Sequence, residues 1–285
     1  MHLIRSILFA ILLTVITVPY AFLATFIFWL PPMTRHRLIT SWVPIMMWVI
    51  RHVLGIRYRV IGAENIPAGP AVVLSKHQSA WETIALQVIF PPLCYVLKRE
   101  LLRVPFFGWA LGMIPGIAID RSAGKDALTQ VVEQGRERLK EGLWVVVFPE
   151  GTRVPPGATR RYKPGGAILA KRAGVPVVPV AHNAGELWRR NAFIKRAGEI
   201  VVSIGPVITV KGEKAEAVNE RAEAWIEAEM RRLFPHHYAD EAAAAAGEAG
   251  AGADESAVPA GKSDAPTATA SGVVAGGPAD EHERT

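Results

Sequence analysis

The chain has 285 residues, of which 50% are hydrophobic and 20% charged, and its formal net charge is +6 at pH 7. This length is enough for one large domain with a full-sized core. Cys94 is the only cysteine, which excludes an internal disulfide and a zinc cluster built from thiolates, and its apolar neighbours predict a buried thiol.

The first 55 residues have the composition of a membrane anchor. No charged side chain occurs from Ser6 to Leu30, and these 25 residues as a helix would cover about 37 Å, enough for the ~30 Å hydrocarbon core of a bilayer. The segment is too long for the apolar part of a secretory signal peptide, and no small-x-small cleavage site follows it, so we expect a retained anchor. A second apolar patch at residues 42–50 suits a helix in the membrane interface, and a hairpin that dips into one leaflet also fits.

Basic residues flank the first apolar segment unevenly. Arg5 precedes it, whereas Arg35, Arg37 and Arg51 follow it. Because cytoplasmic flanks carry an excess of basic residues, this asymmetry favours a protein of the cytoplasmic (inner) membrane whose main domain faces the cytosol.

Strand and helix patterns alternate over residues 56–238, which we take as one domain. The apolar patterns predict strands at 56–60, 71–75, 93–97, 116–119, 143–148, 175–181 and 199–204. They predict helices at 79–90, 123–140, 165–173 and 213–233. This order predicts an α/β fold with a central mixed or parallel sheet flanked by helices. The strand at 143–148 should be buried on both faces, and the two prolines of 175–181 place that strand at a sheet edge or in a groove.

Residues 239–285 form a tail of different composition. The tail is rich in Ala and Gly, lacks apolar periodicity and carries nine acidic and two basic residues, so residues 1–238 have a net charge of +13. We expect the tail to be disordered. The basic remainder suits a membrane of anionic lipid, a phosphate-bearing substrate or an acidic protein partner, and the membrane-like N-terminus argues against nucleic acid.

His77 and Glu82 are the first candidate catalytic residues. They are five positions apart, about 500° of rotation on a helix, so they could not share one helix face. We expect His77 in the turn after strand 71–75 and Glu82 in the first turn of the next helix, where a carboxylate fixes the imidazole tautomer and strengthens the base. A purely structural hydrogen bond is the alternative. No second His or Cys stands at ligand spacing, so we expect no metal there.

The segment Phe-Pro-Glu-Gly-Thr-Arg at 148–153 follows another strand. Its Glu150, Gly151, Thr152 and Arg153 offer backbone amides and a guanidinium fork that suit a phosphate group. An ordinary turn with a Glu150–Arg153 ion pair is the alternative.

Arg121 and Lys163 add positive charge near these motifs. Arg121 follows the strand at 116–119 and is a phosphate ligand or part of a surface ion pair, and Lys163 comes shortly after the turn at 148–153. In parallel sheets, sites gather at the carboxyl ends of the strands, so we expect the motifs after residues 75, 119 and 148 to meet there.

Four segments in this order resemble the blocks of the glycerolipid acyltransferase family. They are His77-x4-Glu82, Gly-Ile-Ala-Ile-Asp-Arg at 116–121, Phe-Pro-Glu-Gly-Thr-Arg at 148–153 and Val-Pro-Val-Val-Pro-Val at 175–180. The resemblance spans roughly residues 56–210, and the first and third blocks are highly specific in combination. It implies a glycerol-3-phosphate acyltransferase-like fold.

The resemblance also implies the chemistry. A fatty acyl chain would move from acyl-CoA or acyl-carrier protein to the sn-2 hydroxyl of lysophosphatidic acid, giving phosphatidic acid in phospholipid biosynthesis, without cofactor or metal. His77 would be the general base and Glu82 would orient it. The glycerol phosphate would be held by Arg121, Glu150, Gly151, Thr152, Arg153 and Lys163. The acyl-donor groove would be lined by Pro176, Val177 and Pro179.

Two positions depart from the family pattern, and other functions stay open. Glu82 stands where the family usually has Asp, and Lys76 stands where Asn is frequent, a change that would alter substrate preference or add a phosphate contact. The alternatives are an acyltransferase acting on another lysolipid such as lyso-ornithine lipid, a hydrolase using the same pair on a lipid ester or thioester, and a non-catalytic lipid-binding protein.

Overall fold

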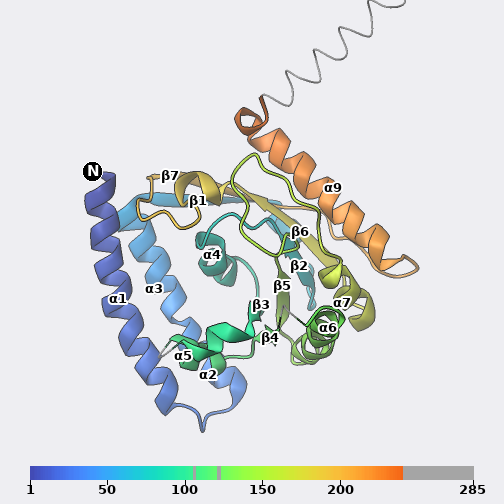
Figure 1. Ribbon diagram of the computed structural model, residues 1–285, viewed down its shortest axis with the longest axis horizontal. Coiled ribbons are helices and arrows are strands. Elements are labelled where there is room, and N and C mark those ends of the chain that lie inside the picture. Colours follow the sequence, from blue (N-terminus) through green and yellow to red (C-terminus); the bar gives the residue numbers. More distant parts are fainter. Residues whose placement is uncertain (105–106, 121–122, 240–285) are drawn as a thin grey trace, which may run out of the picture. The chain divides into compact units, whose positions relative to one another are not determined.

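The computed structural model describes residues 1–104, 107–120 and 123–239. These residues form one seven-stranded sheet with helices on both faces, preceded by N-terminal apolar helices (Figure 1). The predicted α/β class is therefore confirmed. The predicted tail from residue 240 onward and Arg121 lie outside the described residues.

The sheet is parallel except at one pair of strands. Its order is β1-β7-β6-β2-β5-β3-β4, and only the β6–β7 pair is antiparallel. The carboxyl ends of β2, β3, β4 and β5 therefore open on the same edge. The strands are β1 (Ile56–Ile61), β2 (Val72–Ser75), β3 (Leu93–Lys98), β4 (Ile117–Ile119), β5 (Trp144–Val147), β6 (Val177–His182) and β7 (Gly198–Ile204).

The prediction that the proline-containing strand lies at an edge is wrong. β6 lies inside the sheet between β2 and β7. Its pairing with β7 begins only at Val180, while Val177 bridges to Ile208 beyond the end of β7. Pro179, which has no N–H, falls between these two pairings, and its carbonyl still accepts a hydrogen bond from Gly205. The missing donor is therefore tolerated inside the sheet.

Helices cover both faces of the sheet (Figure 1). Successive strand residues alternate between two buried clusters, with Val73 and Val146 in one and Val72 and Val145 in the other. Burial on both faces explains the uninterrupted apolar run at 143–148 and confirms that prediction. One cluster includes residues of α1 (His2–Phe26), α3 (Trp42–Val49) and α4 (Trp81–Ile89), and the other includes residues of α6 (Lys125–Lys140), α7 (Gly165–Ala173) and α9 (Ala215–Leu233).

Shorter elements complete the described chain. They are α2 (Pro32–Thr40), a π-helical turn (Ile50–Leu54), α5 (Phe107–Gly112), α8 (Ala184–Leu187) and 3₁₀ turns at Ala63–Asn65, Arg99–Arg103 and Pro235–His237.

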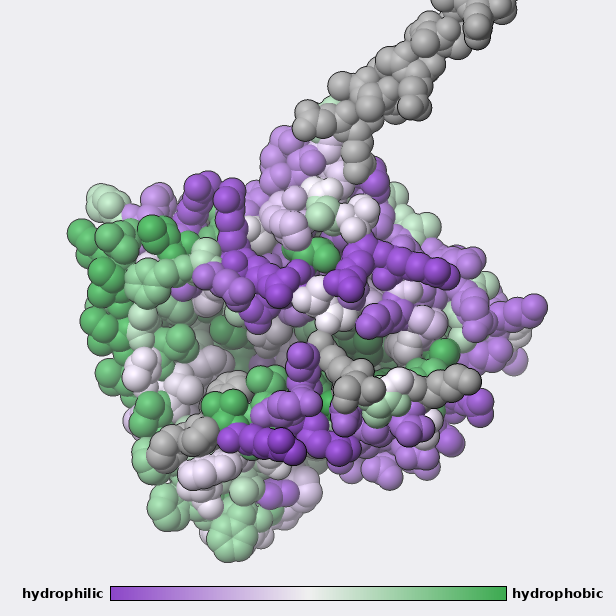
Figure 2. All heavy atoms as spheres, viewed as in Figure 1, coloured by the Kyte–Doolittle hydropathy of each residue, from purple (hydrophilic) through white to green (hydrophobic). Residues whose placement is uncertain are grey.

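In the described part of the chain, α1 is the one helix long and apolar enough to cross a membrane. Only 17% of its most apolar stretch is buried, whereas a core helix would be mostly buried. Figure 2 shows hydrophobic side chains gathered along this side of the molecule and hydrophilic ones on the opposite side. The exposed apolar residues of α1 include Leu3, Ile4, Ile7, Leu8, Ile11, Val15, Val18, Phe22, Leu23 and Phe26. This surface supports the predicted membrane association.

Candidate active site

His77 and Glu82 meet at the carboxyl end of β2. His77 lies in the connection between β2 and α4, and Glu82 is in the first turn of α4. His77 Nδ1 lies 2.9 Å from Glu82 Oε1. The same oxygen accepts hydrogen bonds from the backbone N–H groups of Gln78 (2.9 Å) and Ser79 (2.7 Å). The predicted positions of both side chains are confirmed, and their catalytic role stays a prediction.

The environment of Glu82 fixes the tautomer of His77. Burial favours protonation of the Glu82 carboxyl, but His182, His77 and the Ser79 N–H together outweigh burial and lower its pKa. Since an ionised carboxylate only accepts hydrogen bonds, Nδ1 of His77 carries the proton. The lone pair is then on Nε2, where a general base needs it. The imidazole is 15% exposed and stacks on Phe148, with ring centroids 3.9 Å apart.

The loop after β5 holds the backbone of His77 on both sides. The His77 N–H donates to Glu150 Oε1 (3.2 Å), and its carbonyl accepts from the Val154 N–H (2.8 Å). Gly151 has φ +71°, a left-handed conformation that favours glycine, and a Cβ there would lie 3.3 Å from Lys163 Nζ. This turn brings the third block of the sequence against the first.

Glu150 lies behind the connection between β2 and α4 (residues 76–80, the catalytic loop) and does not line the cavity beside His77, so its predicted substrate contact is corrected. The carboxyl group is fully buried and lies 3.8 Å from Lys76 Nζ. Burial, opposed by Lys76 and by backbone hydrogen bonds, raises the pKa of Glu150 to about 7. Among the described residues, Glu150 forms its ion pair with Lys76. The alternative prediction of a Glu150–Arg153 ion pair is therefore wrong.

Lys76 is also directed away from the cavity. Its side chain is fully buried, and Nζ lies 2.6 Å from Glu227 Oε1 on α9 and 3.3 Å from the Ala158 carbonyl. Tyr162 donates to the same oxygen of Glu227 at 3.0 Å. The suggested phosphate contact of Lys76 is therefore wrong, because the ammonium group joins the catalytic loop to α9.

His182 supports the same loop, and sequence reasoning missed it. This imidazole at the end of β6 is fully buried, with Nε2 2.8 Å from the Lys76 carbonyl and Nδ1 accepting from the Ala184 N–H. Burial is the largest cause that lowers the pKa of His182, and Nε2 carries a proton because it faces the Lys76 carbonyl. No motif or spacing in the sequence marked this residue.

A cavity of about 1140 Å³ opens beside His77. The walls are mostly apolar, and their apolar side chains come from α1, α3, α4, β3, α5 and the residues after it, and α6. They include Leu13, Ala21, Val43, Ile84, Leu97, Leu111, Ile114, Leu128 and Val131. A large, mostly apolar cavity with a few polar groups is typical of a ligand site, and this one suits a long apolar chain.

Polar and cationic groups line the cavity in addition. The predicted residues Gly151, Thr152, Arg153 and Lys163 are part of its wall. Lys98 and Arg190 also line it and were missed. Lys98 ends β3, so the rule that sites form at the carboxyl ends of parallel strands would have indicated it.

The predicted acyl-donor residues lie elsewhere. None of Pro176, Val177 and Pro179 is among the described residues that line the cavity. Val177 is fully buried in the core on the side of the sheet that α9 covers. These three residues do not line the cavity beside His77, and their part in an acyl-donor groove stays a prediction.

A buried carboxylate beside an oriented imidazole, together with a large apolar cavity, is typical of an enzyme that acts on a lipid-like substrate. Ser79 is not placed as a nucleophile, because its hydroxyl accepts a hydrogen bond from the Trp81 N–H at the start of α4.

Comparisons with known proteins agree with this class. The Acyltransferase family model matches residues 57–183. A 1-acyl-sn-glycerol-3-phosphate acyltransferase of Pseudomonas aeruginosa is 49% identical over 237 residues, which are 81% of this chain and 92% of that protein. The enzyme of that name from Saccharomyces cerevisiae is 32% identical over 61% of this chain and 59% of its own length.

A solved structure shares the fold. The crystal structure of the 1-acyl-sn-glycerophosphate (LPA) acyltransferase PlsC from Thermotoga maritima has a TM-score of 0.68 and 22% identity, and the match covers 82% of this chain and 97% of that one. The chain belongs to the family of 1-acyl-sn-glycerol-3-phosphate acyltransferases. The predicted O-acyltransferase is confirmed.

Proposed function

We propose that the enzyme transfers a fatty acyl chain from acyl-CoA or acyl-carrier protein to the sn-2 hydroxyl of lysophosphatidic acid, giving phosphatidic acid. The observation that carries this proposal is the His77–Glu82 pair beside a large apolar cavity. The names of the relatives support the acceptor. The acyl donor is proposed from the resemblance of the four sequence blocks to the family.

The chemistry needs one base and one oriented thioester. His77 Nε2 removes the proton of the acceptor hydroxyl as its oxygen attacks the thioester carbonyl. The C–S bond then breaks, and the thiolate takes the proton from the imidazolium. Glu82 stabilises the positive charge that His77 carries between these steps.

Cationic side chains of the cavity suit the acceptor phosphate. Lys98, Arg153, Lys163 and Arg190 all line it. The guanidinium groups offer paired donors that match phosphate oxygens, and the lysines act as point charges. The apolar walls would hold an acyl chain. A metal ion or other cofactor is not required by this mechanism.

The proposed location is the cytosolic face of the cytoplasmic membrane. The exposed apolar surface of α1 supports attachment to lipid. The basic residues Arg35, Arg37 and Arg51 after this helix support the cytosolic side.

The test is an acyl-transfer assay with purified enzyme. Lysophosphatidic acid is incubated with radiolabelled acyl-CoA or acyl-carrier protein, and the lipids are separated by chromatography. We expect labelled phosphatidic acid from the wild type. His77→Ala should lower the rate by about 10³-fold and Glu82→Gln by about 10²–10³-fold, because they remove the base and the charge that stabilises it.

His52→Ala is the matched control, since His52 is exposed in the π-helical turn and does not line the cavity. Its rate should equal that of the wild type. Free fatty acid without a new diacyl lipid would identify a hydrolase instead. No phosphatidic acid from either donor would disprove the acceptor, and other lysolipids would then be screened.

A further inference from the structure

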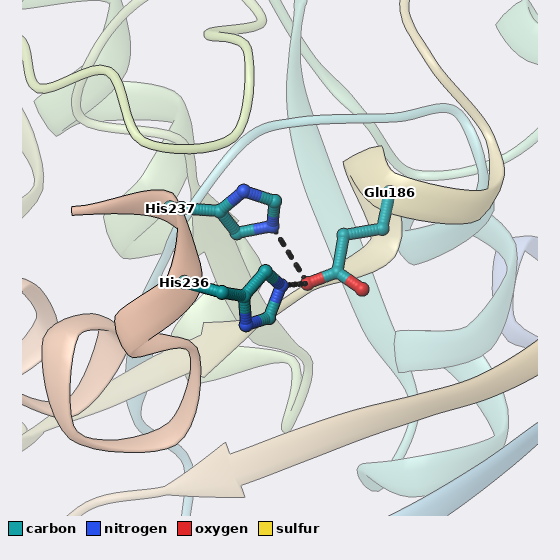
Figure 3. A group of neighbouring side chains, drawn as sticks. All are labelled: Glu186, His236 and His237. Carbon is teal, nitrogen blue, oxygen red and sulfur yellow. Dashed lines mark hydrogen bonds and ion pairs between the residues drawn. The ribbon is translucent and has the colours of Figure 1, made fainter. Parts of the chain in front are cut away.

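Two histidines and a carboxylate form a second cluster of side chains, made of residues distant in sequence from His77 and Glu82. Glu186 lies on α8, and His236 and His237 lie in the 3₁₀ turn Pro235–His237 after α9. Nε2 of His237 lies 2.8 Å and Nε2 of His236 lies 3.3 Å from the same oxygen, Oε1 of Glu186. Figure 3 shows both rings directed at this oxygen. One ligand atom from each residue lies within 4.8 Å of the others.

This arrangement has the composition and spacing of a transition-metal site. Zinc binds imidazole nitrogen and carboxylate oxygen at about 2.0–2.2 Å, so neighbouring ligand atoms of a tetrahedral site are about 3.3–3.5 Å apart. The 3.3 Å separation is already there, and the 2.8 Å separation would need to open by about 0.5 Å to reach that range. Small side-chain rotations supply such a change. A mixed nitrogen and oxygen donor set suits zinc and its neighbours, and not calcium or magnesium.

Exposure of the cluster leaves room for an ion and its remaining ligand. The side chains of Glu186 and His237 are each 22% exposed, and that of His236 is 61% exposed. Three protein ligands with one face open to solvent leave a fourth position for water.

The cluster joins segments that support the catalytic loop. The N–H of Gly185, next to Glu186, donates to Gln78 Oε1 at 3.1 Å, and Gln78 follows the catalytic His77. Gly157, in the loop that also holds His77, packs so closely on the His237 carbonyl that a Cβ would lie 2.6 Å from it. An ion at this place would fasten the end of α9 to α8.

We propose that Glu186, His236 and His237 bind one divalent ion of the zinc class and thereby clamp the C-terminal end of α9 onto α8. The site is separate from the acyl-transfer chemistry and does not depend on the proposed substrate. The competing arrangement has protons in place of the ion, with each imidazole N–H donating to the carboxylate.

The test uses the untagged full-length enzyme in detergent, freed of metal with a chelator. Zn²⁺ is titrated by calorimetry, and Co²⁺ is titrated by visible absorption, which reports tetrahedral coordination directly on the wild type. We expect one equivalent bound with a Kd on the order of 10 μM or tighter. Zn²⁺ should also raise Tm and slow hydrogen exchange at residues 233–239.

Three single variants, His236→Gln, His237→Gln and Glu186→Gln, should each weaken binding by about 10–100-fold. His52→Gln is the matched control and should bind as the wild type does. Circular dichroism of the metal-free variants separates lost ligands from lost folding. Unchanged binding in the folded variants, or no saturable binding by the wild type below about 1 mM, would overturn the proposal. A Tm that depends on pH and not on Zn²⁺ would assign the clamp to protons.

Discussion

Glu150 is a carboxyl group whose ionisation the fold opposes. It is fully buried with the Lys76 ammonium 3.8 Å away, and burial raises its pKa to about 7 against an ordinary value of 4.5. Between these values the folded state binds a proton that the unfolded state has lost. The stabilising contribution is therefore complete below about pH 4.5 and disappears as pH rises through about 7.

Glu150→Gln removes this titration and keeps the side-chain volume. We expect the free energy of unfolding of the wild type to fall relative to that of the variant between pH 4.5 and 8, by on the order of 2–3 kcal/mol. Urea denaturation at several pH values measures the difference. A constant difference for Glu150→Gln would contradict the buried titration.

Local patterns indicated the catalytic pair but not the groups behind it. His77 and Glu82 are five positions apart and so cannot share one helix face. Helix geometry alone therefore placed His77 in the turn after a strand and Glu82 in the first turn of the next helix. Lys76, His182 and Glu227 meet only because α9 and β6 pack beside the loop, with 151 positions between Lys76 and Glu227. Contacts of this range depend on tertiary packing, which no spacing in the sequence encodes.

The bounds of helices and strands were predicted well where a single sequence signal determined them. Helix α7 and most of the strands were expected within one or two residues, because apolar runs ended at glycines or polar turns. The position of β6 in the sheet was predicted wrongly. A proline indicates an edge strand only where a neighbouring strand would otherwise need the N–H group that proline lacks. Here the partner strand has already ended, and that is a property of the neighbouring strand.

Helix α9 is coupled to the catalytic loop by the Lys76–Glu227 ion pair. Both side chains are buried or nearly so, and Glu150 adds a second carboxylate near the ammonium group. Lys76→Met should destabilise the protein by about 3–5 kcal/mol, because it leaves the largely buried Glu227 carboxylate without its cation. The double variant Lys76→Met with Glu227→Met should recover part of this loss, since apolar pairs can replace buried ion pairs. Denaturant unfolding of the wild type, both single variants and the double variant measures the coupling.

Kinetics distinguish this positioning role from a substrate contact. We expect Lys76→Met to lower kcat with little change in the KM for lysophosphatidic acid, because Lys76 does not line the cavity. Lys98→Met is the matched comparison: Lys98 lines the cavity, so KM should rise with little loss of stability. A Lys76→Met enzyme that is stable and has a raised KM would contradict the assignment.

The contacts between α1 and the rest of the molecule determine how this helix can lie at the membrane. The helix is tied to the domain along most of its length: Ser6 Oγ accepts from the Lys195 N–H, Phe9 packs edge-on against Trp188, and Thr17 accepts from Trp42 Nε1. Tyr20 near its far end lines the cavity. A helix that stood across the bilayer would have to carry the catalytic domain into the lipid. We therefore expect α1 to lie in one leaflet with its apolar side in the lipid and both ends on the side of the domain.

Single cysteines can test this topology, because the native thiol is silent. Cys94 is buried, and burial raises its pKa to about 12, so it should not react with a membrane-impermeant maleimide. His2→Cys and Trp29→Cys mark the two ends of the α1 region, and Glu199→Cys marks the domain. In inverted membrane vesicles, which expose the cytosolic side, we expect all three cysteines to be labelled without detergent. Labelling of His2→Cys only after detergent, while Trp29→Cys reacts at once, would show that the helix spans the bilayer. Protection of all three would place the domain on the opposite side.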